Sequence, residues 1–141
     1  MTREQIHTLF ERRHGALARR DSTALADLHA PIGVLESPSA GGTVTGRAAI
    51  ERVYQAWFTA FPDFVFVSDE LLIDGDRVVE VATISGTDTG GFMGLPPTDK
   101  PFRMPVIILF TVKDEHILHE RRVYDFTGLL VQIGVLKAKP A

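Results

Sequence analysis

The chain has 141 residues, a formal net charge of −3 at pH 7 and no cysteine. This length predicts one domain, residues 1–141, with its own hydrophobic core. The acidic balance provides no basic surface for nucleic acid, no apolar run reaches the ~20 residues of a membrane span, and the lack of cysteine excludes disulfides and thiolate chemistry. The N-terminus has no signal-peptide pattern, so a cytoplasmic protein is expected.

Two helices are predicted before residue 30. Thr2-Arg-Glu-Gln5 has the form of a capping box, and a helix over about residues 3–19 follows, with an apolar stripe that only Arg13 interrupts. Asp21 is the expected N-cap of a short second helix through Leu28, which Pro31 closes.

A third helix, residues 47–60, follows a predicted loop over residues 38–46 and carries a broad aromatic face. Tyr54, Trp57 and Phe58 lie on this face, and Phe61 follows it. Aromatic side chains at this spacing fit either a hydrophobic core or the wall of a ligand pocket.

After residue 63 the hydrophobic period changes from helical to alternating, which predicts strands. The expected strands cover residues 64–72, 77–87, 102–113 and 117–125, joined by hairpin turns and one longer loop. The third is apolar on both faces at residues 106–110 and so needs a cover on each side. Helices can supply one cover and a partner subunit the other, which predicts a homodimer.

The loop over residues 86–98 is rich in glycine and proline but contains Phe92 and Met93. Apolar side chains are unusual in a solvated loop. The segment could cover an opening as a lid, or it could pack against the edge of the sheet.

The last strand runs into a short apolar helix, residues 126–133, which Gly134 is expected to end. Period two places Ile117, His119, Arg121, Val123 and Asp125 on one face, and Glu120, Arg122, Tyr124 and Phe126 on the other. Asp125 lies at the junction. It is either a desolvated acid/base carboxyl or simply the N-cap of the helix.

Most other chemical motifs are absent from the sequence. It contains no phosphate-binding loop, no dinucleotide fingerprint and no serine-nucleophile elbow. His116 and His119 point to opposite faces of a strand, so no metal site is expected, and His7, His14 and His29 are isolated. Carboxylates remain as the candidate chemistry, without metal or cofactor.

Five segments in order resemble the SnoaL-like polyketide (ester) cyclase family. They are Phe61-Pro-Asp-Phe64, Gly75-Asp-Arg-Val78, Gly86-Thr-Asp-Thr-Gly90 with Phe92-Met-Gly-Leu-Pro-Pro-Thr98, Glu120-Arg-x-x-Tyr-Asp125, and Leu129-Leu-x-Gln-Ile-Gly134. The resemblance implies an α+β fold, the cone-shaped barrel of nuclear transport factor two and ketosteroid isomerase, with N-terminal helices packed on a curved, mostly antiparallel sheet. It also implies a pocket between the sheet and the helices, and a homodimer.

In that family the carboxylate matching Asp125 is the acid/base. It would take an acidic proton from between two carbonyl groups, and an intramolecular aldol step would follow without a cofactor. The sequence departs from the family in the segment Gly86–Gly90, where many relatives have a histidine at the position of Asp88. Asp88 is either a loop residue or the partner of Asp125 in a carboxyl dyad. Arg121 could bind an enolate oxygen or form a structural ion pair with Glu80 or Asp88.

The leading hypothesis is therefore an enzyme acting on a small hydrophobic, carbonyl-bearing molecule. Its candidate catalytic residues are Asp125, Asp88 and Arg121, and its candidate substrate-binding residues are Tyr54, Trp57, Phe58, Phe61, Phe92, Met93 and His119. A limonene-type epoxide hydrolase fits less well, because Arg103-x-Pro105 lacks the carboxylate. The alternative is a non-catalytic module that binds a hydrophobic ligand or a partner on the same fold.

Overall fold

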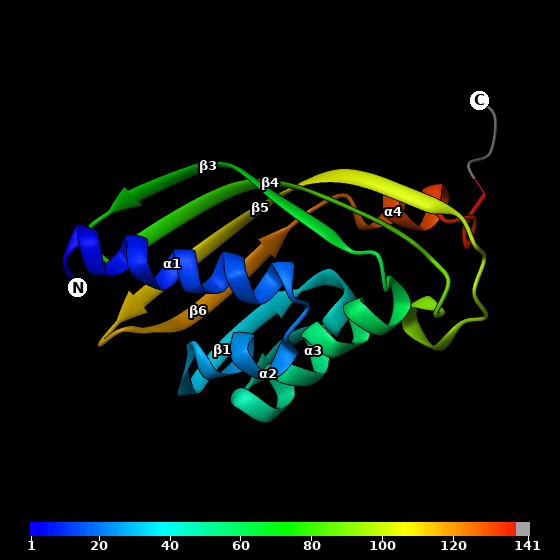
Figure 1. Ribbon diagram of the computed structural model, residues 1–141. Helices are drawn as coiled ribbons and strands as arrows, with labels where there is room; N and C mark the ends of the chain where they lie inside the picture. Colours follow the sequence, from blue (N-terminus) through cyan, green and yellow to red (C-terminus); the bar gives the residue numbers. More distant parts are fainter. Residues whose placement is uncertain (138–141) are drawn as a thin grey trace.

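Three N-terminal helices lie on one side of a curved, open six-stranded sheet in the computed structural model, which describes residues 1–137 (Figure 1). The helices are α1 (Arg3–Ala18), α2 (Ser22–Asp27), α3 (Arg47–Ala60) and, after the sheet, α4 (Phe126–Gln132). The strands are β1 (His29–Ser37), β2 (Gly42–Thr45), β3 (Val65–Asp74), β4 (Arg77–Thr87), β5 (Pro101–Lys113) and β6 (His116–Val123). Their order is β2-β1-β6-β5-β4-β3, and only the β1–β6 pair is parallel. The predicted α+β fold with a mostly antiparallel sheet is confirmed.

The predicted helix starts are also confirmed, with their caps. The Gln5 amide donates to Thr2 Oγ1 at 3.1 Å, and the Thr2 amide donates to Gln5 Oε1 at 2.8 Å, which completes the capping box. Asp21 Oδ1 accepts from the Ala24 amide at 3.0 Å at the start of α2.

The sequence prediction missed β1 and β2, and it was wrong to treat Pro31 as the end of a helix and residues 38–46 as only a loop. Pro31 lies inside β1, where the parallel ladder with β6 shifts register between His29 and Val34. Proline is tolerated at such a register shift, because the interrupted ladder needs no backbone amide donor at that position. One partner of β1, the strand β6, is distant in the chain, and the other, β2, has only four residues, so neither pairing carries a strong local signal.

The inner face of the sheet packs against α1 and α3 and forms the core. Along β5 burial alternates, with Val106, Ile108 and Phe110 buried beneath the helices. Ile107 on the opposite face is 42% exposed. Within the described chain the helices thus cover only one of the two apolar faces.

The loop after β4 packs against α3. The Gly90 amide donates to the Ala60 carbonyl at 3.0 Å, and the Phe92 ring lies 5.2 Å from the rings of Trp57 and Phe61. Phe92 is buried, whereas Met93 is 54% exposed. Phe92 therefore belongs to the core in this conformation.

Candidate functional site

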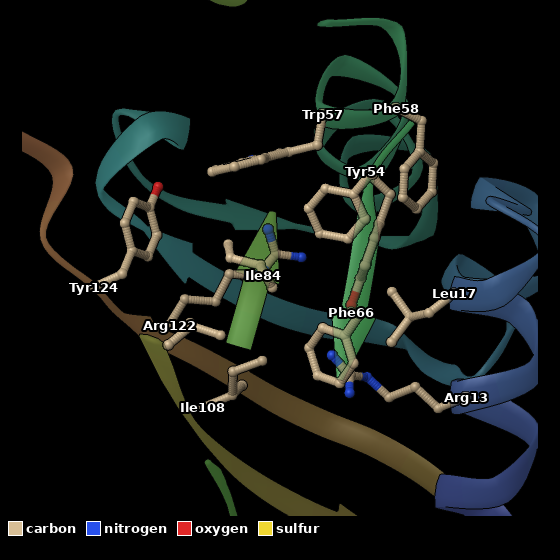
Figure 2. A pocket seen from close by; sticks show the side chains of 12 residues that line it. Arg13, Leu17, Tyr54, Trp57, Phe58, Phe66, Ile84, Ile108, Arg122 and Tyr124 are labelled. Carbon is tan, nitrogen blue, oxygen red and sulfur yellow. The ribbon is translucent and has the colours of Figure 1, made fainter. Parts of the chain in front are cut away.

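A small cavity lies between the inner face of the sheet and the helices α1 and α3, with a volume of about 40 Å³. Figure 2 shows Tyr54, Trp57 and Phe58 along the α3 side, with Arg13 entering from α1. Arg122 and Tyr124 enter from β6 and the segment after it. The remaining walls are apolar side chains: Leu17, Phe64, Phe66, Ile84, Val106 and Ile108. A cavity of about 150 Å³ holds benzene, so an organic ligand requires these side chains to move apart.

Arg122 is the polar group that β6 presents to the cavity. Its Nε donates to Glu120 Oε2 at 2.7 Å, and its guanidinium lies 4.6 Å from the centre of the Tyr54 ring. The Tyr54 hydroxyl donates to Glu120 Oε1 at 2.6 Å. Glu120, which is fully buried, therefore orients both the guanidinium and the phenol.

Arg13 forms a second buried ion pair on the α1 side. Its Nη1 donates to Glu80 Oε1 at 2.6 Å, and Glu80 Oε2 accepts from Ser68 Oγ at 2.8 Å and contacts His14 Nε2 at 2.5 Å. The Arg13 guanidinium also lies 4.8 Å from the centre of the Phe110 ring. Arg13 Nε is buried and has no hydrogen-bond acceptor among the described residues.

His29 completes the cluster from behind Glu120 and is fully buried. Its Nδ1 lies 2.8 Å from the Leu25 carbonyl oxygen, and its Nε2 lies 2.9 Å from Glu120 Oε1. A carbonyl oxygen only accepts, so Nδ1 carries a proton. The Nε2 of His29 faces the Glu120 carboxylate oxygen that also accepts from the Tyr54 hydroxyl.

Burial and ion pairing act in opposite directions on the carboxyl groups. Burial alone would raise the pKa of Glu120, but Arg122, the hydrogen bond from His29, and Arg13 outweigh it and hold this pKa well below 4.5. Burial likewise opposes ionisation of Glu80, yet His14 and Arg13 lower its pKa. Both carboxylates are charged at neutral pH and are poor proton acceptors.

The pKa values of the other two groups are raised. Burial, followed by the charge of Glu120, raises the pKa of Tyr54 to about 12, so its hydroxyl stays protonated. Burial disfavours the charged form of Arg122, but Glu120 and Tyr54 outweigh that effect and raise the pKa of Arg122. Arg122 therefore remains a cation beside the cavity.

A β-bulge decides which face of β6 meets the cavity, and it breaks the predicted alternation between Ile117 and His119. The ladder with β5 pairs Thr111 with His119 and Val112 with Ile117, leaving Leu118 as an extra residue. Ile117 and Glu120, three residues apart, are consequently both fully buried. The inward side chains after the bulge are Glu120, Arg122 and Tyr124, not the set that contains Arg121.

Asp125 caps α4 and does not line the cavity. Its Oδ1 accepts from the Gly128 amide at 2.9 Å, and its side chain is exposed. Gly128 leaves the room for this contact, because a Cβ there would lie 2.2 Å from Asp125 Oδ2. The capping interpretation describes this geometry, and the catalytic role of Asp125 stays a prediction.

Asp88 is fully buried and stabilises the loop that follows it by accepting hydrogen bonds. It accepts from the Gly91 amide at 3.0 Å, and from the Thr98 amide and hydroxyl at 3.2 and 3.0 Å. This is the arrangement of the loop-residue alternative. Asp88 is not part of the cavity wall.

The other predicted site residues divide between the cavity and its surroundings. Tyr54, Trp57 and Phe58 line the cavity, whereas Phe61 and Phe92 support Trp57 from behind. Three others do not line it: Arg121 and Met93 are exposed, and His119 pairs with Glu36 at 2.6 Å on the outer side of the sheet.

The sequence held signals for the residues that were missed. Arg13 is the one charged interruption of the apolar stripe of α1, and Glu80 occupies an inward position between Val78 and Ala82 on β4. A charge at a position whose neighbours require burial indicates a buried ion pair. Glu120 and Arg122 became inward-facing only because of the bulge, which the sequence pattern did not indicate.

Residues 1–137 contain no cluster of three or more His, Asp or Glu side chains placed to hold a metal ion. Within the same residues, every helix is too short or too polar to cross a membrane.

Comparisons with known proteins agree with this architecture. A family model for SnoaL-like polyketide cyclases matches residues 8–133. No curated protein matches the chain.

Several solved structures share the fold. TsrD from Streptomyces laurentii has a TM-score of 0.83 at 24% identity, covering 96% of this chain and 99% of its own. A protein with a ketosteroid isomerase-like fold from Catenulispora acidiphila has a TM-score of 0.78 at 22% identity, covering 94% and 97%. IdmH from Streptomyces antibioticus, a proposed polyketide cyclase, has a TM-score of 0.75 at 27% identity, covering 91% and 97%.

Proposed function

This chain belongs to the SnoaL-like polyketide cyclase family, and from that premise we propose that it is a cofactor-independent enzyme acting on a hydrophobic, carbonyl-bearing molecule. The proposed reaction is enolisation followed by an intramolecular aldol cyclisation or an isomerisation. The observation that carries the proposal is the buried Arg122 guanidinium beside an aromatic cavity. A fixed cation there would stabilise the negative charge that develops on an enolate oxygen.

In this proposal Asp125 acts as the acid/base. Its carboxylate would take the α-proton, the enolate carbon would attack a second carbonyl of the same molecule, and the protonated carboxyl would return the proton to the new alkoxide. The Asp125 side chain must first leave the Gly128 amide, which costs about 1 kcal/mol, the typical value of an N-cap. That cost is small against the ~8 kcal/mol or more of a typical enzymatic rate enhancement.

We propose that substrate enters between Trp57 and Tyr124, whose rings lie 5.7 Å apart at the cavity wall. Both contact Ser39, with Trp57 Nε1 donating to Ser39 Oγ at 3.3 Å and the Ser39 amide donating to the Tyr124 hydroxyl at 3.3 Å, and the Tyr124 hydroxyl also lies 3.1 Å from Ser37 Oγ. These contacts are long and therefore weak. We expect the segment around Ser39 to yield first when a ligand enters.

An exchange assay tests the proposed function without knowledge of the natural substrate. A hydrophobic 1,3-diketone such as 1-phenylbutane-1,3-dione is incubated with the protein in heavy water, and deuterium uptake at the carbon between the carbonyls is followed by NMR. The expected result is protein-dependent exchange that Tyr54→Phe slows, because this change removes a hydroxyl that orients Glu120 and hence Arg122. Exchange no faster than in buffer would contradict the proposal.

Asp125→Asn separates the catalytic role of Asp125 from its role as a cap. Asparagine caps a helix about as well as aspartate, so the free energy of unfolding should stay within about 0.5 kcal/mol of the original. Exchange should nevertheless fall by about 10²-fold or more, because the amide cannot accept the proton. A variant of unchanged activity would remove Asp125 from the mechanism.

A second candidate function is a binding module without catalysis. The exposed, capping position of Asp125 favours it, as does the pairing of both buried carboxylates with arginines. This candidate predicts saturable ligand binding, measured by the fluorescence of Trp57, the single tryptophan of the chain, without any exchange.

A further inference from the structure

Arg13 brings an unused hydrogen-bond donor to the cavity. Its side chain reaches the cavity from α1 and is 2% exposed (Figure 2). Its Nε is the single buried side-chain nitrogen or oxygen among residues 1–137 that has no hydrogen-bond partner. An unpaired buried donor costs free energy, and the cost is larger for a charged group such as a guanidinium. An acceptor atom that reached Nε would remove this cost.

Glu80, the carboxylate paired with Arg13, is already occupied by other donors. Its Oε1 accepts from Arg13 Nη1 at 2.6 Å, and its Oε2 faces Ser68 Oγ at 2.8 Å and His14 Nε2 at 2.5 Å. Glu80 is also not among the residues that line the cavity. An acceptor for Arg13 Nε therefore has to enter from the cavity itself.

The Arg13 guanidinium is also fixed in position before any ligand arrives. The ion pair with Glu80 holds one end, and the rings of Phe66 and Phe110 lie 5.2 and 4.8 Å from Arg13 Cζ. A donor that is already ordered binds its acceptor without a further loss of side-chain entropy. Arg13 thus has the two properties of a ligand-binding group, a free donor and a fixed orientation.

Arg122 reaches the same cavity from the opposite side, on β6 (Figure 2). We propose that Arg13 Nε donates a hydrogen bond to a carbonyl oxygen of the ligand, which makes Arg13 a second oxygen-binding residue beside Arg122. This inference rests on the proposed function for the place of the ligand and names the residue that holds its second oxygen. A neutral oxygen suffices, because the hydrogen bond requires a lone pair and not a charge.

The second oxygen has a definite part in the proposed aldol step. While Arg122 stabilises the enolate, Arg13 Nε donates to the carbonyl that the enolate carbon attacks. As the new carbon–carbon bond forms, the electron pair of that carbonyl moves to its oxygen, and Nε stabilises the resulting alkoxide until it receives the proton.

A ketone and its hydrocarbon analogue test the hydrogen bond. Acetophenone and α-methylstyrene have nearly the same shape, but only the ketone oxygen can accept. The Kd of each is measured by calorimetry for the original protein and for Arg13→Lys, which places a methylene group where Nε was and keeps a cation for Glu80. The affinity for the ketone relative to the hydrocarbon should fall about tenfold or more in Arg13→Lys, the effect of one hydrogen bond to a charged group.

The ratio of the two affinities is the informative quantity, because the different hydration of the two probes cancels when variants are compared. Arg12→Lys, the same change at an exposed neighbouring position of α1, is the matched control and should leave the ratio unchanged. An equal ratio in the original protein and in Arg13→Lys would overturn the inference. So would the absence of saturable acetophenone binding to the original protein.

A second measurement observes the donor directly and needs no variant. The Arg13 Nε–H signal is assigned through its side-chain carbons by NMR, and its proton should move downfield and exchange more slowly with water when acetophenone binds. α-Methylstyrene should not cause this change. The same response to both probes would mean that the ketone oxygen does not reach Nε, as when a water molecule satisfies the donor, and would overturn the inference.

These outcomes are distinct from those of the proposed function. Ketone-selective binding that depends on Arg13, without deuterium exchange on the diketone, would support the oxygen site and reject the enzyme. Exchange on the diketone together with an unchanged ratio in Arg13→Lys would reject the oxygen site and keep the enzyme. Thermal unfolding shows that each variant is folded before it is titrated.

Discussion

Glu120 is the residue on which the cavity depends most directly, because its carboxylate accepts hydrogen bonds from residues of three different elements. Its Oε1 faces Tyr54 on α3 and His29 on β1, and its Oε2 faces Arg122 on its own strand. Glu120→Gln keeps the shape of the side chain but replaces one carboxylate oxygen with an NH2 group, which faces hydrogen-bond donors. The buried Arg122 guanidinium also loses its negatively charged partner. We expect a loss of about 3–5 kcal/mol in the free energy of unfolding, measured by urea denaturation. Glu11→Gln, on the exposed face of α1, should stay within about 0.5 kcal/mol.

The lowered pKa values of Glu80 and Glu120 also predict how stability depends on pH. A carboxyl whose pKa is lower in the folded state binds fewer protons than in the unfolded state, so it stabilises the fold above the unfolded value of about 4.5. This contribution is lost as the pH falls through the folded-state pKa. The thermal midpoint should therefore fall steeply below about pH 4.5. A midpoint that stays flat down to pH 3 would show that these carboxylates are not paired in solution.

The loop after β4 is positioned by a close approach of its backbone to α3. A Cβ at Gly90 would lie 1.8 Å from the Thr59 carbonyl oxygen, and backbone cannot move aside as a side chain can. Gly90→Ala should therefore detach the loop and expose Phe92, with a loss of about 1–3 kcal/mol. The expected readout is faster amide exchange at Gly91 and Thr98, whose amides donate to Asp88. Thr89→Ala, at an exposed neighbouring position, should leave both amides protected.

The elements that the sequence predicted are those whose signals are local. The capping box at Thr2, the apolar period of α3 and the Asp-Gly turn between β3 and β4 are all written within a few residues. β1 was missed because Pro31 and Gly33 interrupt its pattern. Of its two partner strands, β6 lies far away in the chain and β2 has only four residues. The cavity-facing side of β6 was misassigned for a related reason: the bulge at Leu118 arises from pairing, and one extra residue exchanges the two faces.

At the scale of the molecule, the outer face of the sheet is the surface that the single chain leaves open. Val81, Ile107 and Val123 are opposite one another across β4, β5 and β6, and Ile107 and Val123 are 42% and 47% exposed. Val65 and Val67 on β3 add further exposed apolar area. The homodimer expected from the sequence remains a proposal, and this row is where we place its contact, since a contiguous apolar face of this kind favours self-association.

Ile107→Asp tests that placement at the centre of the row. A carboxylate buried against its symmetry-related copy would be desolvated and repelled, so the variant should be a monomer by sedimentation under conditions where the original protein is a dimer. Its fold should persist, because the Ile107 side chain points away from the core. The cavity lies on the opposite side of the sheet, so Trp57 fluorescence should report unchanged ligand binding in the monomer. An original protein that is itself monomeric would reject the dimer, and a dimer that survives the substitution would move the contact elsewhere.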